Sequence, residues 1–77
     1  MKKIIKDVLY DTDKADLLYT YVSFRKRKLY YKTEKGNYFC VYSNKEIQPM
    51  AEDEFKEFIG EVDPDKYIEL FGMPEEA

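Results

Sequence analysis

The clearest pattern along the chain is a pair of alternating runs, rich in aromatic and β-branched residues, on either side of a short polar loop. The loop, residues 34–36, ends in Gly36, which suits the left-handed backbone that a short hairpin loop requires. The pattern predicts a β-hairpin over residues 27–43, with Thr33 opposite Asn37. Side chains on such strands alternate between two faces. We expect the core face to carry Leu29, Tyr31, Phe39 and Val41.

The opposite face of this hairpin combines rings with positive charge. If the first face is the core, the second is expected to be an aromatic surface edged by lysines. Its residues would be Lys28, Tyr30, Lys32, Tyr38, Cys40 and Tyr42.

The pattern before the hairpin is mixed. Residues 2–10 alternate imperfectly, which predicts a first strand, and the side chain of Thr12 could cap a short helix after it. Apolar residues then recur at helical spacing over residues 15–22, but the same stretch is dense in β-branched and aromatic residues, which favour a strand. We expect one or two helical turns near residues 13–18, followed by a strand over residues 19–25.

The chain after the hairpin predicts a short strand and then a helix. Residues 45–48 suit an edge strand that Pro49 ends, because proline has no amide hydrogen to donate. Acidic residues in the first helical turn suit the positive end of the helix dipole, and Gly60 marks the expected end of the helix. The apolar stripe of this helix is Ala51, Phe55, Phe58, Ile59 and Val62.

A second helix is predicted by its end signals. Asp63 and Pro64 have the N-cap and first-turn identities that start a helix, and Gly72 would end it. The helix would span residues 64–71 and bury Ile68 and Phe71, together with Tyr67 or Leu70, while residues 73–77 are expected to fray.

These elements predict one α+β domain over residues 1–77. A small antiparallel sheet centred on the 27–43 hairpin would be covered on one face by the two short C-terminal helices. Its core is expected to contain Leu29, Tyr31, Phe39, Val41, Phe55, Phe58, Ile59, Ile68 and Phe71.

Charge divides the chain into two unlike parts. Residues 1–45 carry 11 lysines and arginines against 5 acidic residues, whereas residues 46–77 carry 2 against 11. The net charge of −3 therefore hides a basic part and an acidic part, which predicts two differently charged surfaces.

Composition weighs against catalysis, cofactors and metals. The chain has no histidine and a single cysteine, so it can form neither an internal disulfide nor a Cys/His zinc site. Cys40 lies in mid-strand and is expected to be structural. Asp11, Asp13 and Asp16 suit capping better than calcium binding, since the glycine and distal glutamate of a calcium loop are missing. We expect a non-enzymatic protein without cofactor or metal.

No apolar run approaches the roughly 18 residues that a membrane span needs. The apolar region near the start is broken by Lys6 and Asp7 after two residues. We therefore expect a cytoplasmic protein with no membrane partner.

Two charged surfaces and one aromatic face are candidates for binding. Carboxylates on the helices could imitate a phosphate backbone and occupy the basic groove of a nucleic-acid enzyme. Alternatively, the basic stretch could hold phosphates while its rings stack on bases, or the aromatic sheet face could form a homodimer. Each charged surface could also be an ordinary solvated exterior. The acidic set is Glu52, Asp53, Glu54, Glu57, Glu61, Asp65 and Glu69. The basic and aromatic set is Arg25, Lys26, Arg27, Lys28, Tyr30, Lys32, Tyr38 and Tyr42.

Several short motifs resemble those of small orphan proteins carried by phages and conjugative elements of Gram-positive bacteria. Residues 10–15 are similar to a Y-D-T-x-x-A opening, and residues 29–39 are similar to an L-Y…K-G-x-[FWY]-F hairpin. Residues 48–54 and 65–72 also look like theirs, so the resemblance spans roughly residues 8–72.

This loose group includes some anti-CRISPR proteins. The resemblance implies a protein that binds and inhibits a host defence nuclease in the bacterial cytoplasm, with a CRISPR effector as its partner. The acidic helices would then be the nucleic-acid-mimicking surface. A nucleic-acid-binding accessory protein that uses residues 25–32 is the alternative.

Overall fold

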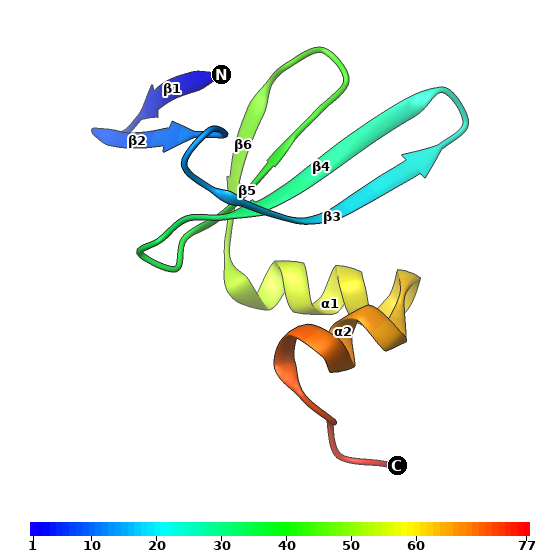
Figure 1. Cartoon of the computed structure of the whole chain (residues 1–77). Coiled ribbons are helices and arrows are strands. Elements are labelled where there is room, and N and C mark those ends of the chain that lie inside the picture. The colour runs from blue at the N-terminus through cyan, green and yellow to red at the C-terminus, as the bar shows by residue number, and fades with distance from the viewer.

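The computed structural model describes residues 1–77 as six strands and two helices (Figure 1). The α+β class is confirmed: a two-stranded and a four-stranded antiparallel sheet are followed by two short helices. The elements are β1 (Lys2–Ile5), β2 (Val8–Asp11), β3 (Asp16–Ser23), β4 (Lys26–Lys32), β5 (Tyr38–Val41), β6 (Ile47–Met50), α1 (Glu52–Val62) and α2 (Pro64–Phe71).

The predicted central hairpin is formed by β4 and β5, in the expected register. Leu29 pairs with Val41 and Tyr31 pairs with Phe39. The Thr33 amide donates to the Asn37 carbonyl at 2.8 Å, and Gly36 has the positive φ of 87° that the loop requires. This hairpin lies at the centre of the four-stranded sheet, whose order is β3-β4-β5-β6.

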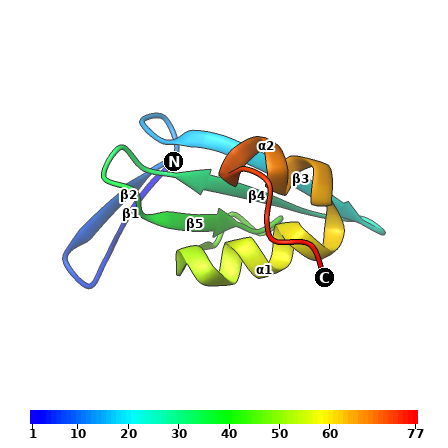
Figure 2. The same cartoon turned by 90° about the horizontal axis from the view of Figure 1, so that it is seen from below.

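The two helices cover one face of this sheet, as expected, but it is the face that the sequence analysis assigned to solvent. Figure 2 shows both helices lying over this face. Tyr30, Tyr38 and Cys40 are only 3–4% exposed and form a core cluster with Phe55 and Ile59 of α1. The alternation separated the two faces correctly but could not tell which one the helices cover, because both faces are rich in apolar rings. A tyrosine ring packs like any other aromatic ring when its hydroxyl reaches the edge of the core.

The other face of the sheet has a core of its own. Phe39 and Val41 are buried there with Tyr10 and Ile47, and the β1–β2 hairpin lies on this side (Figure 1). Of the expected core residues, Phe39, Val41, Phe55 and Ile59 are buried. The half-buried ones are Leu29, Tyr31, Phe58, Phe71 and Ile68, and only Ile68 lies outside both clusters.

The prediction of one strand over residues 2–10 is wrong, because these residues fold back as a hairpin. Lys6 and Asp7 form its two-residue turn with φ values of 50° and 66°. This left-handed pair matches the twist of the flanking strands, although lysine lacks the usual preference for it. The two residues that broke the apolar run are therefore the turn itself.

The helical turns predicted near residues 13–18 are also wrong. The chain makes a single turn in which the Asp11 carbonyl accepts from the amides of Lys14 and Ala15, and β3 then starts at Asp16. Pairing with β4 overrides the helical spacing. A bulge between Leu17 and Tyr19 explains the mixed pattern, because it shifts the alternation by one residue.

Pro49 and Gly60 do not end their elements. Pro49 lies inside β6, opposite Phe39, on the edge strand of the sheet. The Tyr42 amide donates to the Glu46 carbonyl, and hydrogen-bonded and non-hydrogen-bonded pairs alternate along two antiparallel strands. The pair of Phe39 and Pro49 is therefore a non-hydrogen-bonded one, so the Pro49 nitrogen faces away from β5 and no hydrogen bond is lost. Gly60 lies inside α1, which continues to Val62.

The second helix begins and ends as predicted. Its bounds are Pro64 and Phe71, and the Asp63 side chain accepts from the Lys66 amide at 3.1 Å, which makes Asp63 a true N-cap. Gly72 follows with a φ of 91°, a backbone conformation that favours glycine.

Candidate interaction surfaces

The charge division of the sequence becomes a spatial division. The acidic part of the chain forms the edge strand β6 and the helical layer, whereas the basic part forms the other five strands (Figure 1). The turn that joins β3 to β4 extends beyond the helices at one end of the molecule (Figure 2). The molecule therefore presents an acidic helical side and a basic hairpin tip.

Three carboxylates form a row along α1. Asp53, Glu57 and Glu61 recur at every fourth residue, so they follow one side of the helix with a rise of about 6 Å between neighbours. All three are exposed, and none makes an ion pair or a side-chain hydrogen bond. We call this set the α1 carboxylate row.

Three of the other predicted acidic residues are engaged within the chain. Glu54 accepts from the Ala51 amide at 3.1 Å and so completes the start of α1. Glu52 accepts from the Tyr38 hydroxyl at 3.3 Å and pairs with Lys56 at 3.5 Å. The remaining two lie on α2: Glu69 pairs with Lys66 at 3.3 Å, and Asp65 is exposed in the first turn.

The basic residues divide into an exposed group and a second group that lies over rings. Arg25, Lys26 and Arg27 are exposed around the β3–β4 turn. The Lys28 amine lies 5.0 Å from the centre of the Tyr42 ring, and the Lys32 amine lies 5.6 Å from the centre of the Tyr38 ring, both within cation–π range. Lys32 is at the far end of β4, so it does not join the other basic residues.

The expected aromatic binding face does not exist as predicted. Tyr30 and Tyr38 are buried beneath α1, and Tyr42 is half-buried. Burial raises the pKa of Tyr30 to about 12, and burial followed by the nearby Glu52 carboxylate raises the pKa of Tyr38. These rings are core residues, so neither base stacking nor a homodimer can use this face.

Cys40 lies in the same buried layer. It is 4% exposed, and its thiol pKa is raised, with burial as the main cause. A raised pKa lowers the fraction of thiolate, which is the reactive form, so the site has the chemistry of a structural cysteine.

Sequence reasoning missed Phe24. The predicted strand over residues 19–25 included Phe24 near its end, but β3 ends at Ser23 and Phe24 begins the turn. Its ring is fully exposed, and an open hollow of about 720 Å³ lies beside it. The hollow is lined by Tyr21, Ser23, Phe24, Arg25, Lys26 and Lys28. The one signal that could have indicated this turn is the length of the connection, because Phe24 and Arg25 form a two-residue link between two strands that pair with each other.

No family model, curated protein or solved structure matches the chain. Neither helix is long and apolar enough to cross a membrane.

Proposed function

We propose that the chain is a non-enzymatic protein of a phage or mobile element that binds and inhibits a host defence nuclease. The target is a CRISPR effector, and the α1 carboxylate row occupies a basic groove that otherwise holds nucleic acid. The observation that carries the proposal is this row of three exposed, unpaired carboxylates on one helix.

The row is held in a fixed geometry. On the other side of α1, Phe55 and Ile59 are fully buried against the sheet, so the helix cannot rotate without exposing them. Rigid placement lowers the entropy lost on binding. A line of like charges with regular spacing offers a basic groove what a phosphate backbone offers, and it accelerates association at low salt.

The engaged carboxylates support the row instead of belonging to it. Glu54 bonds to the backbone at the start of α1, and Glu52 connects the helix to Tyr38 of β5. We therefore assign partner binding to Asp53, Glu57 and Glu61, with Asp65, exposed in the first turn of α2, as a further candidate. The choice of partner class is supported by the resemblance to small phage and mobile-element proteins.

The test uses neutral, nearly isosteric variants. The row variant is Asp53→Asn, Glu57→Gln and Glu61→Gln. The matched control is Glu34→Gln, Glu75→Gln and Glu76→Gln, which changes the net charge equally at three exposed, unpaired positions. Circular dichroism establishes that both variants keep the fold.

Binding to the purified CRISPR effector and inhibition of its DNA cleavage are then measured. We expect the row variant to bind about 10- to 100-fold more weakly, as three charge contacts of modest strength predict, and to lose inhibition in proportion. The control should behave like the wild type. Equal inhibition by wild type and row variant would refute the assignment, and no inhibition by the wild type would refute the proposed target.

A further inference from the structure

Phe24 is the residue whose placement is least explained by stability. It has a φ of 55°, in the left-handed region that glycine and asparagine favour, and it is 102% exposed. A bulky residue there is strained, and a ring in solvent gains no packing in return. A glycine or asparagine would make the turn more stable, so stability does not explain why an aromatic residue stands at this position.

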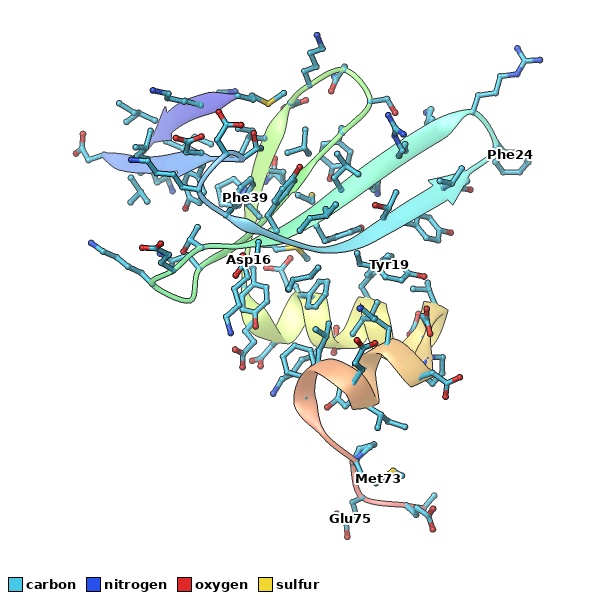
Figure 3. All side chains as sticks on the ribbon, in the orientation of Figure 1. Asp16, Tyr19, Phe24, Phe39, Met73 and Glu75 are labelled. Carbon is cyan, nitrogen blue, oxygen red and sulfur yellow. The ribbon has the colours of Figure 1, made fainter.

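The residues around Phe24 supply positive charge on a firm support. Arg25, Lys26 and Arg27 follow it directly and have exposed side chains without ion pairs. The Ser43 hydroxyl accepts from the Arg27 amide at 2.9 Å and donates to the Arg27 carbonyl at 3.2 Å, which ties the base of the tip to the β5–β6 turn. Figure 3 shows Phe24 at the end of the β3–β4 hairpin, beyond the end of the helices.

Hollows lie on both sides of this basic strand end. The hollow of about 720 Å³ beside Phe24 includes Tyr21 and Ser23, and a second hollow of about 360 Å³ runs between Lys26 and Tyr42. The first is within the size range of small-ligand sites. A binding site for a nucleotide needs a ring on which the base can stack and cations that contact its phosphates, and this end of the hairpin has both beside a hollow.

We propose that the hairpin tip, residues 24–28, is a binding site for single-stranded nucleic acid. Phe24 stacks on an unpaired base, and Arg25, Lys26 and Arg27 contact the flanking phosphates. A ring stacks on any base, so the binding is tolerant of sequence. The site differs from the sheet face predicted from the sequence, because Tyr30 and Tyr38 are not part of it.

The net charge of −3 does not prevent this binding. The longest dimension of the molecule is 40 Å, several times the Debye length of about 8 Å at physiological salt, and the tip extends beyond the acidic helices. The site is independent of the α1 carboxylate row, so either assignment can fail without the other.

A membrane surface fits the tip less well. Arg25, Lys26 and Arg27 would suit anionic lipids, but Phe24 is the only ring that is fully exposed there, and four of the six residues that line the adjoining hollow are polar or charged. Interfacial insertion depends on a broad apolar face. Vesicle binding is therefore included as an outcome of the test.

The test is fluorescence anisotropy with labelled 12-nucleotide single-stranded DNA and RNA, and with the corresponding DNA duplex. Phe24→Asn removes the ring and suits the backbone, so it separates binding from folding. Phe24→Trp restores a stacking ring. The charge variant is Arg25→Gln, Lys26→Gln and Arg27→Gln, and its matched control is Lys2→Gln, Lys3→Gln and Lys35→Gln, at three exposed lysines.

We expect Phe24→Asn to weaken binding to single strands about 10-fold, which is within the range for loss of one stacked base, while its melting temperature stays equal or rises. Phe24→Trp should bind like the wild type. The charge variant should bind more weakly and reduce the slope of log K against log salt by about 2, since each phosphate contact on a single strand contributes about 0.7. The lysine control should retain the wild-type affinity.

Three results would each overturn the proposal. The first is no binding of single strands by the wild type. The second is equal affinity of the wild type, Phe24→Asn and the charge variant. The third is Phe24-dependent binding to phosphatidylserine vesicles without Phe24-dependent binding to oligonucleotides, which would make the tip a membrane contact.

Discussion

At the scale of single residues, the tyrosines of the sheet are core residues with a polar edge. Tyr30 stacks on Phe58 with ring centres 4.5 Å apart, and Tyr38 stacks on Phe55 at 5.4 Å. The Tyr38 hydroxyl donates to Glu52, so the ring is buried while its polar atom keeps a partner. The folded chain therefore favours the neutral, protonated form of these two tyrosines.

The burial of Tyr30 predicts a loss of stability at alkaline pH. Its pKa is raised from the usual value of 10.0 to about 12, so the folded chain holds the proton more tightly than the unfolded chain. The stability that this tighter binding of the Tyr30 proton contributes is complete below pH 10 and is lost as the pH rises through about 12. Melting temperatures between pH 8 and 12 should fall less steeply above pH 10 for Tyr30→Phe than for the wild type. Parallel curves for the two proteins would contradict the prediction.

At the scale of elements, the start of α1 depends on one carboxylate. Glu54 accepts from the Ala51 amide at 3.1 Å and lies near the positive end of the helix dipole. Glu54→Lys removes the bond and places a positive charge there, so we expect a loss of about 1–2 kcal/mol in the free energy of unfolding. Glu57→Lys, in the middle of the helix, should change it by less than about 0.5 kcal/mol. Urea denaturation measures both, and equal losses would rule out the capping role.

The interior glycine of α1 offers an opportunity to stabilise the element. Gly60 does not have a positive φ, and a Cβ added there would lie 3.7 Å from a ring carbon of Tyr67, an ordinary contact. Gly60→Ala should therefore raise the free energy of unfolding by about 0.5–1 kcal/mol, because alanine loses less backbone entropy in a helix. A lower urea midpoint for the variant would show that the α1–α2 contact has no room for a methyl group.

At the scale of the whole molecule, the four-stranded sheet has a separate hydrophobic cluster on each of its two faces. Phe55 is fully buried on the helical side. Phe39, labelled in Figure 3, is fully buried on the side of the β1–β2 hairpin. Adjacent residues of β4 and β5 contribute to opposite clusters, so neither face can open without disturbing the strands that hold the other. The domain should unfold as one cooperative unit.

Truncation of one ring on either face should therefore destabilise the entire domain. Phe55→Ala should cost about 3–5 kcal/mol, a large part of the roughly 4–12 kcal/mol expected for a chain of this length. Tyr10→Ala should also lower stability, although by less, because Tyr10 lies at the margin of its cluster with 9% exposure. Ile4→Ala, at a 70% exposed position, is the control. Circular dichroism should record one transition for each variant, whereas two separate transitions would mean that the faces unfold independently.

The features that the sequence alone determined are those specified by near neighbours. The loop ending in Gly36 set the register of β4 against β5, and Asp63 with Pro64 set the start of α2. Such signals depend on turn chemistry and capping over a few residues, so the register and the helix start can be predicted without knowledge of the rest of the fold. The carboxylate row was also predictable, because its residues lie on one helix.

The tertiary structure decided which face the helices cover, where β3 begins and which rings remain exposed. Tyr30 and Leu29 lie on opposite faces with similar apolar content, so the choice depends on the fit of Phe55 and Ile59 against one of them. Pairing with β4 overrode the helical spacing over residues 15–22 and placed Phe24 in a turn. These outcomes depend on contacts between residues far apart in the chain, whose energies no local pattern contains.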